Sequence, residues 1–567
     1  MFVRVKTTPN SPRKAVQLVE AVRTGGKVRQ RIVRHLGVAA DDEALARLKE
    51  LGEYLKAQIA EHRQPSLFPP EQVATQVIEA ARREAAVPDE TALTVDLKAL
   101  REEQRVVTGI HEAYGRVYRD LGFDRLLSAS RHRASAPVLF HTVMARIANP
   151  HSKRETVRRL GRDFGVAVPL EKVYRMMDRL DGAFIGRLRA RVASATEALL
   201  PEPVNVLFFD CSTLYFESVA EDVADTPGQE TLKAFGYSKD GRANRVQVLL
   251  ALMVTHDGLP LGYEVFEGST YEGHTFLPML RTMRQRYQPA QAVCVADAGM
   301  FSHENLAELE AQGHRYLVGA RLRNLPKALK ARVLKRERYR RMPGGEAGLR
   351  VGVFRHRGRR IVVSYSPKRA KKDAGDRRRA VRRLLKRLKK SAQPRSLLGH
   401  GAARYVRLKG QALWEIDPGK IAQAARWDGL HGVVTNLRGV PAAELFERYR
   451  GLWQVEESFR ITKHDLKVRP IFHWTPKRVR AHLAIAFMAF ACVRHLAYRV
   501  ALQKRRMSPG VIRDALLHRQ NSVLRHVRTG RRYAIPSPAS PETKLIYETL
   551  GLTWSDVPHA LETAESK

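Results

Sequence analysis

Alternation of apolar and polar residues near the N-terminus predicts a β-hairpin followed by a helix. Two alternating runs within residues 16–35 flank Thr24–Lys27, which reads Thr-Gly-Gly-Lys and is typical of a tight turn. Leucines at helical spacing follow Asp41 and Asp42, and either aspartate is a suitable helix N-cap. The proline-rich segment Gln64–Pro70 predicts a linker after this helix.

The helical period dominates from about residue 108 to residue 200. Pro137 opens one predicted helix, Ser152 and Glu155 form a capping box for the next, and Pro169 opens a third. Three short helices of this kind are compatible with a helix-turn-helix reader of DNA or with a plain helical bundle, and the pattern leaves both open. The arginines expected on their outward faces are Arg158, Arg159, Arg162 and Arg175.

After residue 204 the pattern changes to nearly continuous apolar runs, which indicate strands buried on both faces. The second and third runs meet at Asp257-Gly258 and are predicted to pair as a hairpin. Helical patterns at residues 274–287 and 303–312 separate the later runs, so the order of elements predicts a mixed α/β sheet. The five predicted strands are Val204–Phe209, Val246–Val254, Leu259–Phe266, Ala292–Ala296 and Tyr316–Ala320.

The net charge of the chain says more about its function than its overall composition does. The 567 residues contain 100 Lys+Arg and 58 Asp+Glu, a formal net charge of +42, which points to a polyanionic partner. Residues 321–410 contain 32 Lys/Arg and only 4 Asp/Glu, a net charge of +28. A charge run is usually a solvated face, but two-thirds of the charge in one short segment favours a binding surface. Within it the pattern predicts a hairpin at 349–365 and a basic helix at 376–390.

An anionic membrane is the competing partner, and the sequence disfavours it. The charge-free apolar run Leu483–Val493 has 11 residues, whereas spanning a bilayer takes about 20. No apolar secretory segment is found within Met1–Lys27. Cys211, Cys294 and Cys492 are widely spaced in apolar segments, so we expect neither a disulfide framework nor a zinc site, and a reduced, cytoplasmic compartment.

Two of the predicted strands end in an aspartate, Asp210 and Asp297. Active sites of α/β sheets collect at the carboxyl ends of strands, although a lone aspartate there is more often part of a turn. Side by side, two such carboxylates would repel one another unless they bound a divalent cation. A long predicted helix, 442–463, offers Glu456, with Tyr449 and Lys463 about two turns away on the same face. The alternative for this helix is a surface helix with ordinary salt bridges.

Asp210, Asp297 and Glu456 in this order, on this frame of strands and helices, resemble the DDE transposases of bacterial insertion sequences. The resemblance is greatest to the insertion-sequence-four group, whose signature is Tyr-x2-Arg-x3-Glu-x6-Lys; Tyr449, Glu456 and Lys463 match it in register. Members of that group carry a β-rich insertion between the last two acids, which are 159 residues apart here. The signature arginine is replaced by Leu452, and the residues proposed to supply its phosphate contact are Arg460 and then Arg450.

The resemblance implies a ribonuclease-H-like mixed sheet with a β-rich basic insertion, preceded by a mainly helical DNA-binding region with an N-terminal β-hairpin. It implies that Asp210, Asp297 and Glu456 are catalytic and hold Mg²⁺, with Mn²⁺ as a substitute, and that the DNA ends are cut and joined to target DNA. Tyr449 and Lys463 would grip the DNA. Trp453 would be either a stacking partner for an unpaired base or a core aromatic. A homodimer bound to double-stranded DNA in the bacterial nucleoid is expected.

This reading divides the chain into six segments. They are residues 1–65 (hairpin plus helix), 66–200 (helical DNA-binding region), 201–320 (first part of the catalytic core), 321–425 (basic insertion), 426–505 (second part of the core) and 506–567 (C-terminal tail region).

Two other functions are compatible with the same residues. A nuclease of the same fold would cleave DNA without joining it. A non-catalytic DNA-binding protein derived from a transposase would have no need for three clustered acids beside DNA. The sequence contains neither a phosphate-binding loop of the GxxxxGK[ST] type nor a Cys/His metal cluster, so other enzyme classes find no support.

Overall fold

The computed structural model divides into two compact units, Met1–Leu100 and Arg101–Lys567, which are described separately. The residues that the structure describes are 1–7, 14–24, 27–39, 42–61, 95–127, 130–224, 230–238, 244–284, 292–342, 348–389, 403–409, 413–503 and 506–561. The predicted linker at 64–70 lies outside these residues.

The N-terminal unit is a three-stranded antiparallel sheet with one helix packed on it. The predicted hairpin and the helix that follows it are both confirmed, and a further strand pairs with the hairpin's first strand. The helix approaches the sheet closely at Gly52, where a Cβ would lie 2.5 Å from the Val3 side chain. Its elements are β1 (Phe2–Thr7), β2 (Lys14–Thr24), β3 (Lys27–Ala39) and α1 (Asp42–Glu61).

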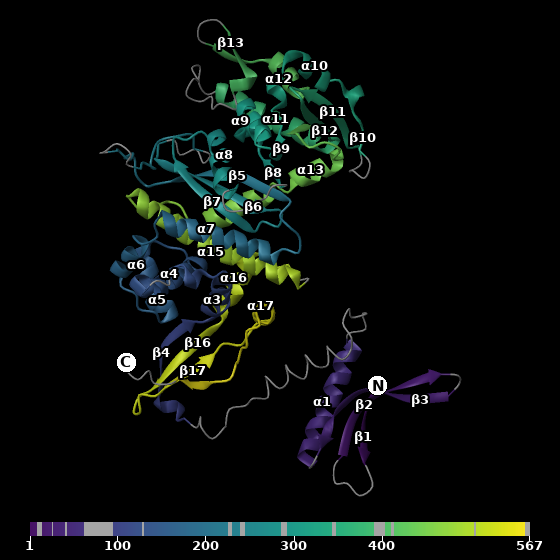
Figure 1. Ribbon diagram of the computed structural model, residues 1–567, viewed down its shortest axis with the longest axis vertical. Helices are drawn as coiled ribbons and strands as arrows, with labels where there is room; N and C mark the ends of the chain where they lie inside the picture. Colours follow the sequence, from purple (N-terminus) through teal and green to yellow (C-terminus); the bar gives the residue numbers. More distant parts are fainter. Residues whose placement is uncertain are drawn as a thin grey trace. The chain divides into compact units, whose positions relative to one another are not determined.

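The larger unit is organised around a nine-stranded mixed sheet (Figure 1). The five strands predicted from residue 204 onward are all present, and the predicted hairpin at Asp257-Gly258 is confirmed. In spatial order the strands are β10 (Arg340–Arg341), β11 (Arg350–His356), β12 (Arg359–Tyr365), β15 (Leu430–Thr435), β9 (Arg315–Gly319), β8 (Val293–Ala296), β5 (Val206–Tyr215), β6 (Gln247–Thr255) and β7 (Pro260–Glu267). The first of the five, β5, is longer than predicted: it continues to Tyr215 because β6 pairs with it up to that residue, so Asp210 lies inside this strand and not at its end.

Different helices cover the two faces of this sheet. Side chains alternate along a strand, so Phe208 and Phe209 of β5 point to opposite faces. Phe209 belongs to an apolar cluster with residues of α8 and α9, whereas Phe208 belongs to the larger cluster that contains residues of α14 and α15. These helices are α8 (Phe276–Arg284), α9 (His303–Ala311), α14 (Trp453–Arg460) and α15 (Pro476–Leu502).

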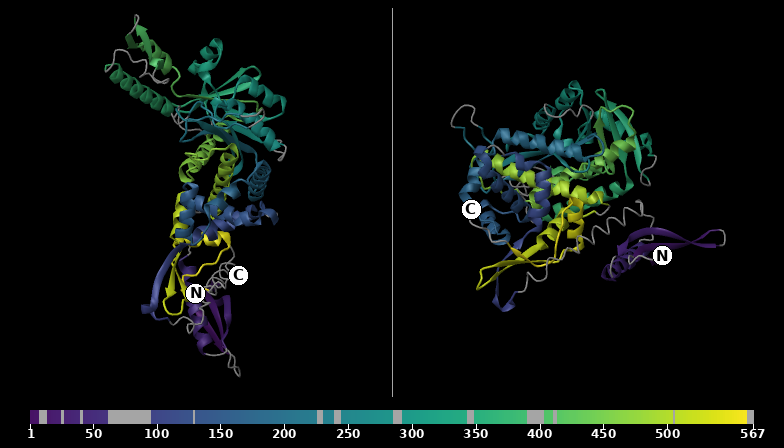
Figure 2. Two further views of the ribbon diagram at one scale, coloured as in Figure 1. Left: turned by 90° about the vertical axis from the view of Figure 1, so that its left-hand side faces the viewer. Right: turned by 60° about the horizontal axis from the view of Figure 1, so that its bottom comes forward.

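Helix α15 connects the sheet to the helical region. It is apolar and long enough to cross a membrane, yet most of its side chains are buried inside the protein, as in the core helix of a folded domain. It lies beside α7 beneath β7 (Figures 1 and 2), and Arg189 of α7 forms a bidentate ion pair with Glu264 of β7 at 2.6 and 2.8 Å. The helices of this region are α3 (Gly115–Asp120), α4 (Ala136–Ala148), α5 (Lys153–Phe164), α6 (Leu170–Met177) and α7 (Gly182–Leu199).

The arginines expected on the outward faces of α5 and α6 are largely paired within their own helices. Arg158 and Arg159 contact Glu155, Arg162 contacts Asp163, and Arg175 contacts Glu171. The Ser152 hydroxyl accepts a hydrogen bond from the Glu155 amide, as the predicted capping box requires. The choice between a helix-turn-helix reader and a plain bundle stays open.

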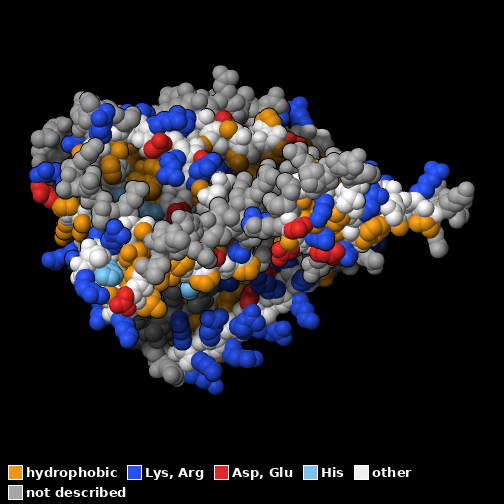
Figure 3. Space-filling model, turned by 90° about the horizontal axis from the view of Figure 1, so that it is seen from below, with side chains coloured by type: hydrophobic (Ala, Val, Ile, Leu, Met, Phe, Trp, Pro, Cys, Tyr) orange, Lys and Arg blue, Asp and Glu red, His pale blue; other side chains and the backbone are white. Residues whose placement is uncertain are grey.

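The basic segment that was predicted to be a β-rich insertion is instead mixed. Its strands β10, β11 and β12 extend the central sheet, and its longest element is helix α11, which begins well before the predicted residue 376 because Ser366 caps it and a proline opens it. Lys and Arg side chains are widespread on the face drawn in Figure 3. The further elements here are α10 (Lys327–Val333), α11 (Pro367–Leu388), β13 (Val406–Lys409), β14 (Leu413–Ile416) and α12 (Pro418–Ala425).

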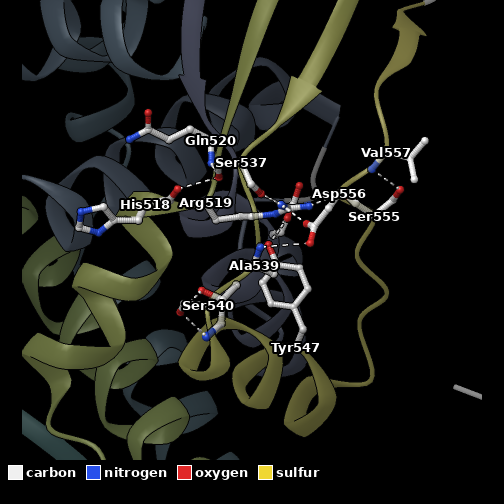
Figure 4. A network of polar contacts seen from close by, with 12 residues as sticks. His518, Arg519, Gln520, Ser537, Ala539, Ser540, Tyr547, Ser555, Asp556 and Val557 are labelled. Atoms are coloured by element: carbon white, nitrogen blue, oxygen red, sulfur yellow. Dashed lines mark hydrogen bonds and ion pairs between the residues drawn. The ribbon is translucent and has the colours of Figure 1, made fainter. Parts of the chain in front are cut away.

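The C-terminal residues form a second sheet together with a strand from the start of the unit. Arg519, only 6% exposed, joins the parts of this region (Figure 4). Its guanidinium donates to the carbonyls of Ser537 and Ser555 and to Asp556 Oδ1, and its own carbonyl accepts from the Gly109 amide. The elements are β4 (Leu100–Val107), α16 (Pro509–His518), β16 (Gln520–His526), β17 (Arg532–Pro536), α17 (Pro541–Leu550) and β18 (His559–Leu561), none of which the sequence analysis predicted.

Arg519→Met should therefore destabilise the C-terminal sheet. The substitution removes the donors of three hydrogen bonds and leaves two carbonyls without their partner, a loss of about 1–3 kcal/mol. Urea denaturation followed by circular dichroism measures the effect. The matched control is Arg531→Met, whose side chain is exposed and should change the midpoint little. Equal midpoints for the two variants would contradict this role of Arg519.

Candidate active site

Asp210 and Asp297 occupy neighbouring positions of two parallel strands. β5 and β8 pair in parallel with Phe209 opposite Ala296, and the next residue on each chain is one of the two aspartates. Because side chains alternate, both carboxylates point to the face that carries Phe208, the same face that α14 covers. The predicted proximity of the two strands is thus confirmed, and their pairing brings two of the three predicted acids together.

The helix predicted over residues 442–463 is divided in the structure. It consists of α13 (Ala442–Arg450), α14 and a π-helical turn at Ile461–Asp465. The division falls at Gly451, and glycine is among the poorest helix formers. The Phe208 ring packs against this glycine so closely that a Cβ would lie 2.3 Å from its Cζ atom. This contact holds the start of α14 against β5 at Phe208, a residue two positions before Asp210.

Tyr449, the last but one residue of α13, reaches across the end of β9 to Asp297. Its hydroxyl donates a long hydrogen bond of 3.4 Å to Asp297 Oδ1. Gly319 makes room for this approach, because a Cβ at that position would lie 2.6 Å from the Tyr449 hydroxyl. The Asp297 Oδ1 atom also accepts from the Ala298 amide at 2.7 Å, so the carboxylate is held from two sides.

Electrostatics keep the groups around Asp297 in defined protonation states. Burial raises the pKa of Tyr449, and the negative charges of Asp297 and Glu456 raise it further, so the phenol stays protonated and acts as a donor. The His431 ring lies 5.3 Å from the Tyr449 ring, centroid to centroid. Burial lowers the pKa of His431 to about 4, with a further contribution from the Arg369 charge, so this imidazole is neutral at physiological pH.

The carboxylates of Asp297 and Glu456 have no ion-pair partner in the part of the chain that the structure describes. Glu456 is exposed on α14, within electrostatic reach of Tyr449. Oxygen ligands of this kind suit Mg²⁺ or Mn²⁺. Among the described residues, however, no three His, Cys, Asp or Glu side chains are gathered closely enough to hold an ion together, so the three acids do not form a closed ligand set in this structure.

Of the residues considered for contact with a DNA phosphate, some are buried or already paired and others are exposed and, in the described part of the chain, unpaired. Leu452, in the slot of the signature arginine, is 8% exposed and part of the core. Arg460 binds the Glu457 carboxylate with two hydrogen bonds of 2.6 and 2.7 Å and also contacts Asp465. Arg450 is exposed and has no ion pair among the described residues. Of the two arginines, Arg450 is therefore the one available to a ligand.

The other two predicted DNA contacts lie on the same stretch of chain. Lys463 is half-buried in the π-helical turn, seven residues after Glu456. Trp453, at the start of α14, is 56% exposed. The alternative that Trp453 is a core aromatic is therefore wrong, because the apolar side of α14 is formed by Val455 and Phe459 instead.

A large cavity adjoins this site and was not predicted residue by residue. Arginines outnumber acids in its wall, which also contains Asp373, Asp376 and Asp428, and Asp373 and Asp428 pair with two of those arginines. It has a volume of about 690 Å³, and His431, which packs on Tyr449, is part of its wall. Arg321 also lies at the acids, since it donates to the Gly299 carbonyl at 2.7 Å, two residues after Asp297. The only sequence signal for this cavity was the density of basic residues in 321–410. The arginines lining it are Arg321, Arg323, Arg369, Arg377 and Arg404.

Two family models match the chain. The model described as "Transposase DDE domain" matches residues 220–492, a range that contains Asp297 and Glu456 and begins ten residues after Asp210. The model described as "IS1634 family transposase, N-terminal domain" matches residues 2–66. Both agree with the resemblance found in the sequence, and the second gives the family of insertion sequences.

Comparisons with individual proteins add little. No curated protein matches the chain. One solved structure, described as "Mos1 transposase paired-end complex with left transposon end", is 11% identical and covers 49% of this chain and 74% of its own, with a TM-score of 0.14. A likeness at that TM-score carries no argument about this chain.

The packing of Tyr449 over Gly319 can be tested by a double-mutant cycle. Gly319→Ala should destabilise the larger unit by about 1–3 kcal/mol, because the added methyl group collides with the Tyr449 hydroxyl. Adding Tyr449→Phe should recover part of that loss by removing the oxygen. Gly299→Ala is the matched control, since its Cβ would meet nothing closer than 4.0 Å. Strictly additive effects in urea denaturation would show that Tyr449 does not occupy this space.

Proposed function

This chain belongs to the DDE transposases of insertion sequences, and we propose that it binds the terminal inverted repeats of its element, cleaves the DNA ends and joins the 3′-hydroxyls to target DNA. The observation that carries the proposal is the placement of Asp210 and Asp297 at adjacent positions of β5 and β8, under Tyr449 and beside the helix that bears Glu456. A chain that only bound DNA would gain nothing from carboxylates at this place.

Asp210, Asp297 and Glu456 are the residues proposed to hold divalent metal ions, Mg²⁺ or Mn²⁺. Their donor set fits: all three supply carboxylate oxygens, and no cation neutralises Asp297 or Glu456 among the described residues. Held by these three carboxylates, such ions would supply Lewis-acid activation of an attacking water or 3′-hydroxyl and charge stabilisation of the leaving oxygen. The three carboxylates, which do not form a closed ligand set by themselves, would come together around the ions when the phosphate is bound. Tyr449 would keep Asp297 oriented through its hydroxyl proton.

The architecture supports a ribonuclease-H-like core. The strand order β9-β8-β5-β6-β7, with β5, β8 and β9 parallel and β6 antiparallel to β5, brings the two acid-bearing strands to the centre of the sheet. A transposition reaction joins two element ends, so we propose that a homodimer forms the synaptic complex. Such an enzyme would act in the cytoplasm, on double-stranded DNA of the nucleoid.

The surface around the acids is proposed to hold the DNA. Arg450 is available for the phosphate contact that Leu452 cannot make, and Lys463 lies further along the same stretch. The exposed ring of Trp453 offers a stacking surface for an unpaired base. Arginines of the 690 Å³ cavity would contact backbone phosphates, with little dependence on sequence and a steep dependence on salt.

Asp297→Ala and Glu456→Gln should abolish cleavage and leave binding of the DNA ends intact or slightly tighter. Both substitutions remove a metal ligand and a negative charge beside DNA, and losing a two-metal site removes most of the rate enhancement. The assay uses a labelled duplex carrying the gene's flanking repeat and a supercoiled plasmid, with and without Mg²⁺. Glu447→Gln is the matched control, since this exposed glutamate is on α13 outside the acid set.

The outcomes distinguish three functions. Metal-dependent cutting at the repeat with a joined product supports the transposase. Cutting without joining would indicate a nuclease of the same fold. Binding by the wild-type chain without any cutting would indicate a DNA-binding derivative, and loss of binding in Asp297→Ala would mean that this residue is structural.

Arg450→Gln should weaken binding to the repeat more than Arg460→Gln does. Arg450 is free to contact a phosphate, so its loss should reduce the slope of log affinity against log salt by about one. Arg460 is already bound to Glu457 and Asp465, and its exposed ion pairs contribute only about 0–1 kcal/mol to stability. Fluorescence anisotropy over a salt series measures both. The opposite ranking would assign the phosphate contact to Arg460.

A further inference from the structure

A second cavity, distinct from the arginine cavity beside the acids, is built from buried basic groups. It has a volume of about 260 Å³ and is lined by residues of α4, α5, α6, the start of α15 and the loop 467–473. None of the lining residues is an aspartate or a glutamate. Three of its basic side chains are at least 95% buried, namely Arg146, Lys153 and His482.

Two of these groups lack the partner that burial demands. The Lys153 ammonium has no hydrogen-bond or ion-pair partner in the described part of the chain. His482 uses its Nε2 atom on the Val468 carbonyl at 3.1 Å, but its buried Nδ1 atom has no partner. Leaving a charged or polar group buried and unpaired costs several kcal/mol. The Lys153 ammonium can therefore donate to an incoming acceptor, whereas the free Nδ1 atom of the neutral His482 ring is itself an acceptor and would donate only once the ring is protonated.

The surroundings favour an anion. Lys153 is the first residue of α5, a 12-residue helix whose N-terminal residues Ser152, Lys153 and Arg154 line the cavity, although the Glu155 amide is already capped by the Ser152 hydroxyl. Arg146 faces the same space and donates to the carbonyls of Leu466 and Lys467 at 3.1 and 3.2 Å. Glu155, the acid of the first turn, is already paired with two arginines of its own helix.

The backbone conformation and the protonation states of the lining residues both fit a site that binds an anion. Lys467 has a φ of 42°, a left-handed conformation that is rare for a lysine, and its carbonyl is one of those that bind Arg146. Burial lowers the pKa of Lys153 well below its usual range and lowers that of His473 to about 3, and neighbouring cations lower both further. A bound anion would reverse these effects.

We propose that this cavity binds a phosphate group. Phosphate is the anion whose oxygens match a helix N-terminus and an ammonium, and its negative charge would favour protonation of the His482 ring, which then offers an Nδ1–H as a further donor. The space is several times the roughly 30 Å³ that a water molecule occupies, enough for a tetrahedral anion. The phosphate belongs either to a DNA backbone or to a free anion. Neither source involves Asp210, Asp297 or Glu456, so the proposal does not depend on the catalytic function.

The test compares the wild-type chain with Lys153→Met, which removes the unpaired charge and keeps the volume. Lys172→Met, on the exposed side of α6, is the matched control. Inorganic phosphate, against chloride at equal ionic strength, should raise the thermal midpoint of the wild-type chain and of Lys172→Met. It should not raise that of Lys153→Met, although this variant should be at least as stable without phosphate because a buried unpaired charge is gone.

A second arm distinguishes the two sources. If the phosphate is part of DNA, Lys153→Met should weaken binding of a fluorescent duplex and reduce its salt slope by about one, and inorganic phosphate should compete. If the source is a free anion, duplex binding should stay unchanged while the phosphate-induced stabilisation is lost. No stabilisation of the wild-type chain by phosphate, together with unchanged duplex binding, would overturn the proposal. Should Lys153→Met not fold, Arg154→Met at the exposed mouth of the cavity serves in its place.

Discussion

Parallel pairing of β5 with β8 is the constraint on which the candidate active site depends. The hydrogen-bond register places Phe209 opposite Ala296, and the alternation of side chains then turns Asp210 and Asp297 toward the same face. The contact of Phe208 with Gly451 seats α13 and α14 on that face. A slip of one residue in either strand would send one carboxylate into the apolar cluster on the other side of the sheet.

The distribution of charge determines which ligands this arrangement of residues can attract. The chain has a net charge of +42, and elsewhere most described acids, such as Glu264 and Glu155, are paired with arginines. Asp297 is held instead by a neutral phenol and a backbone amide. An exposed arginine cavity next to uncompensated carboxylates attracts a polyanion as a whole while leaving local negative charge that a divalent cation can neutralise.

Much of the fold could be predicted because its signals are local. The buried strands, the capping box at Ser152 and the spacing of Tyr449, Glu456 and Lys463 are properties of short windows. The break at Gly451 escaped prediction because it depends on Phe208, a residue more than 200 positions away. Strand β4 of the C-terminal sheet was missed for the same reason, since its partner β16 lies near the other end of the chain. The exposure of Trp453 could not be predicted either, because neighbouring apolar residues compete for the same buried side of the helix.

The central claim is that Asp210 and Asp297 share a metal ion, and binding of Mn²⁺ tests it most directly. Electron paramagnetic resonance of the wild-type chain with a repeat-bearing duplex would count the tightly bound ions without requiring turnover. We expect Asp210→Asn and Asp297→Asn to lose the same ion, each to the same extent, while DNA binding persists. Retention of all bound Mn²⁺ in both variants, with DNA still bound, would contradict the account.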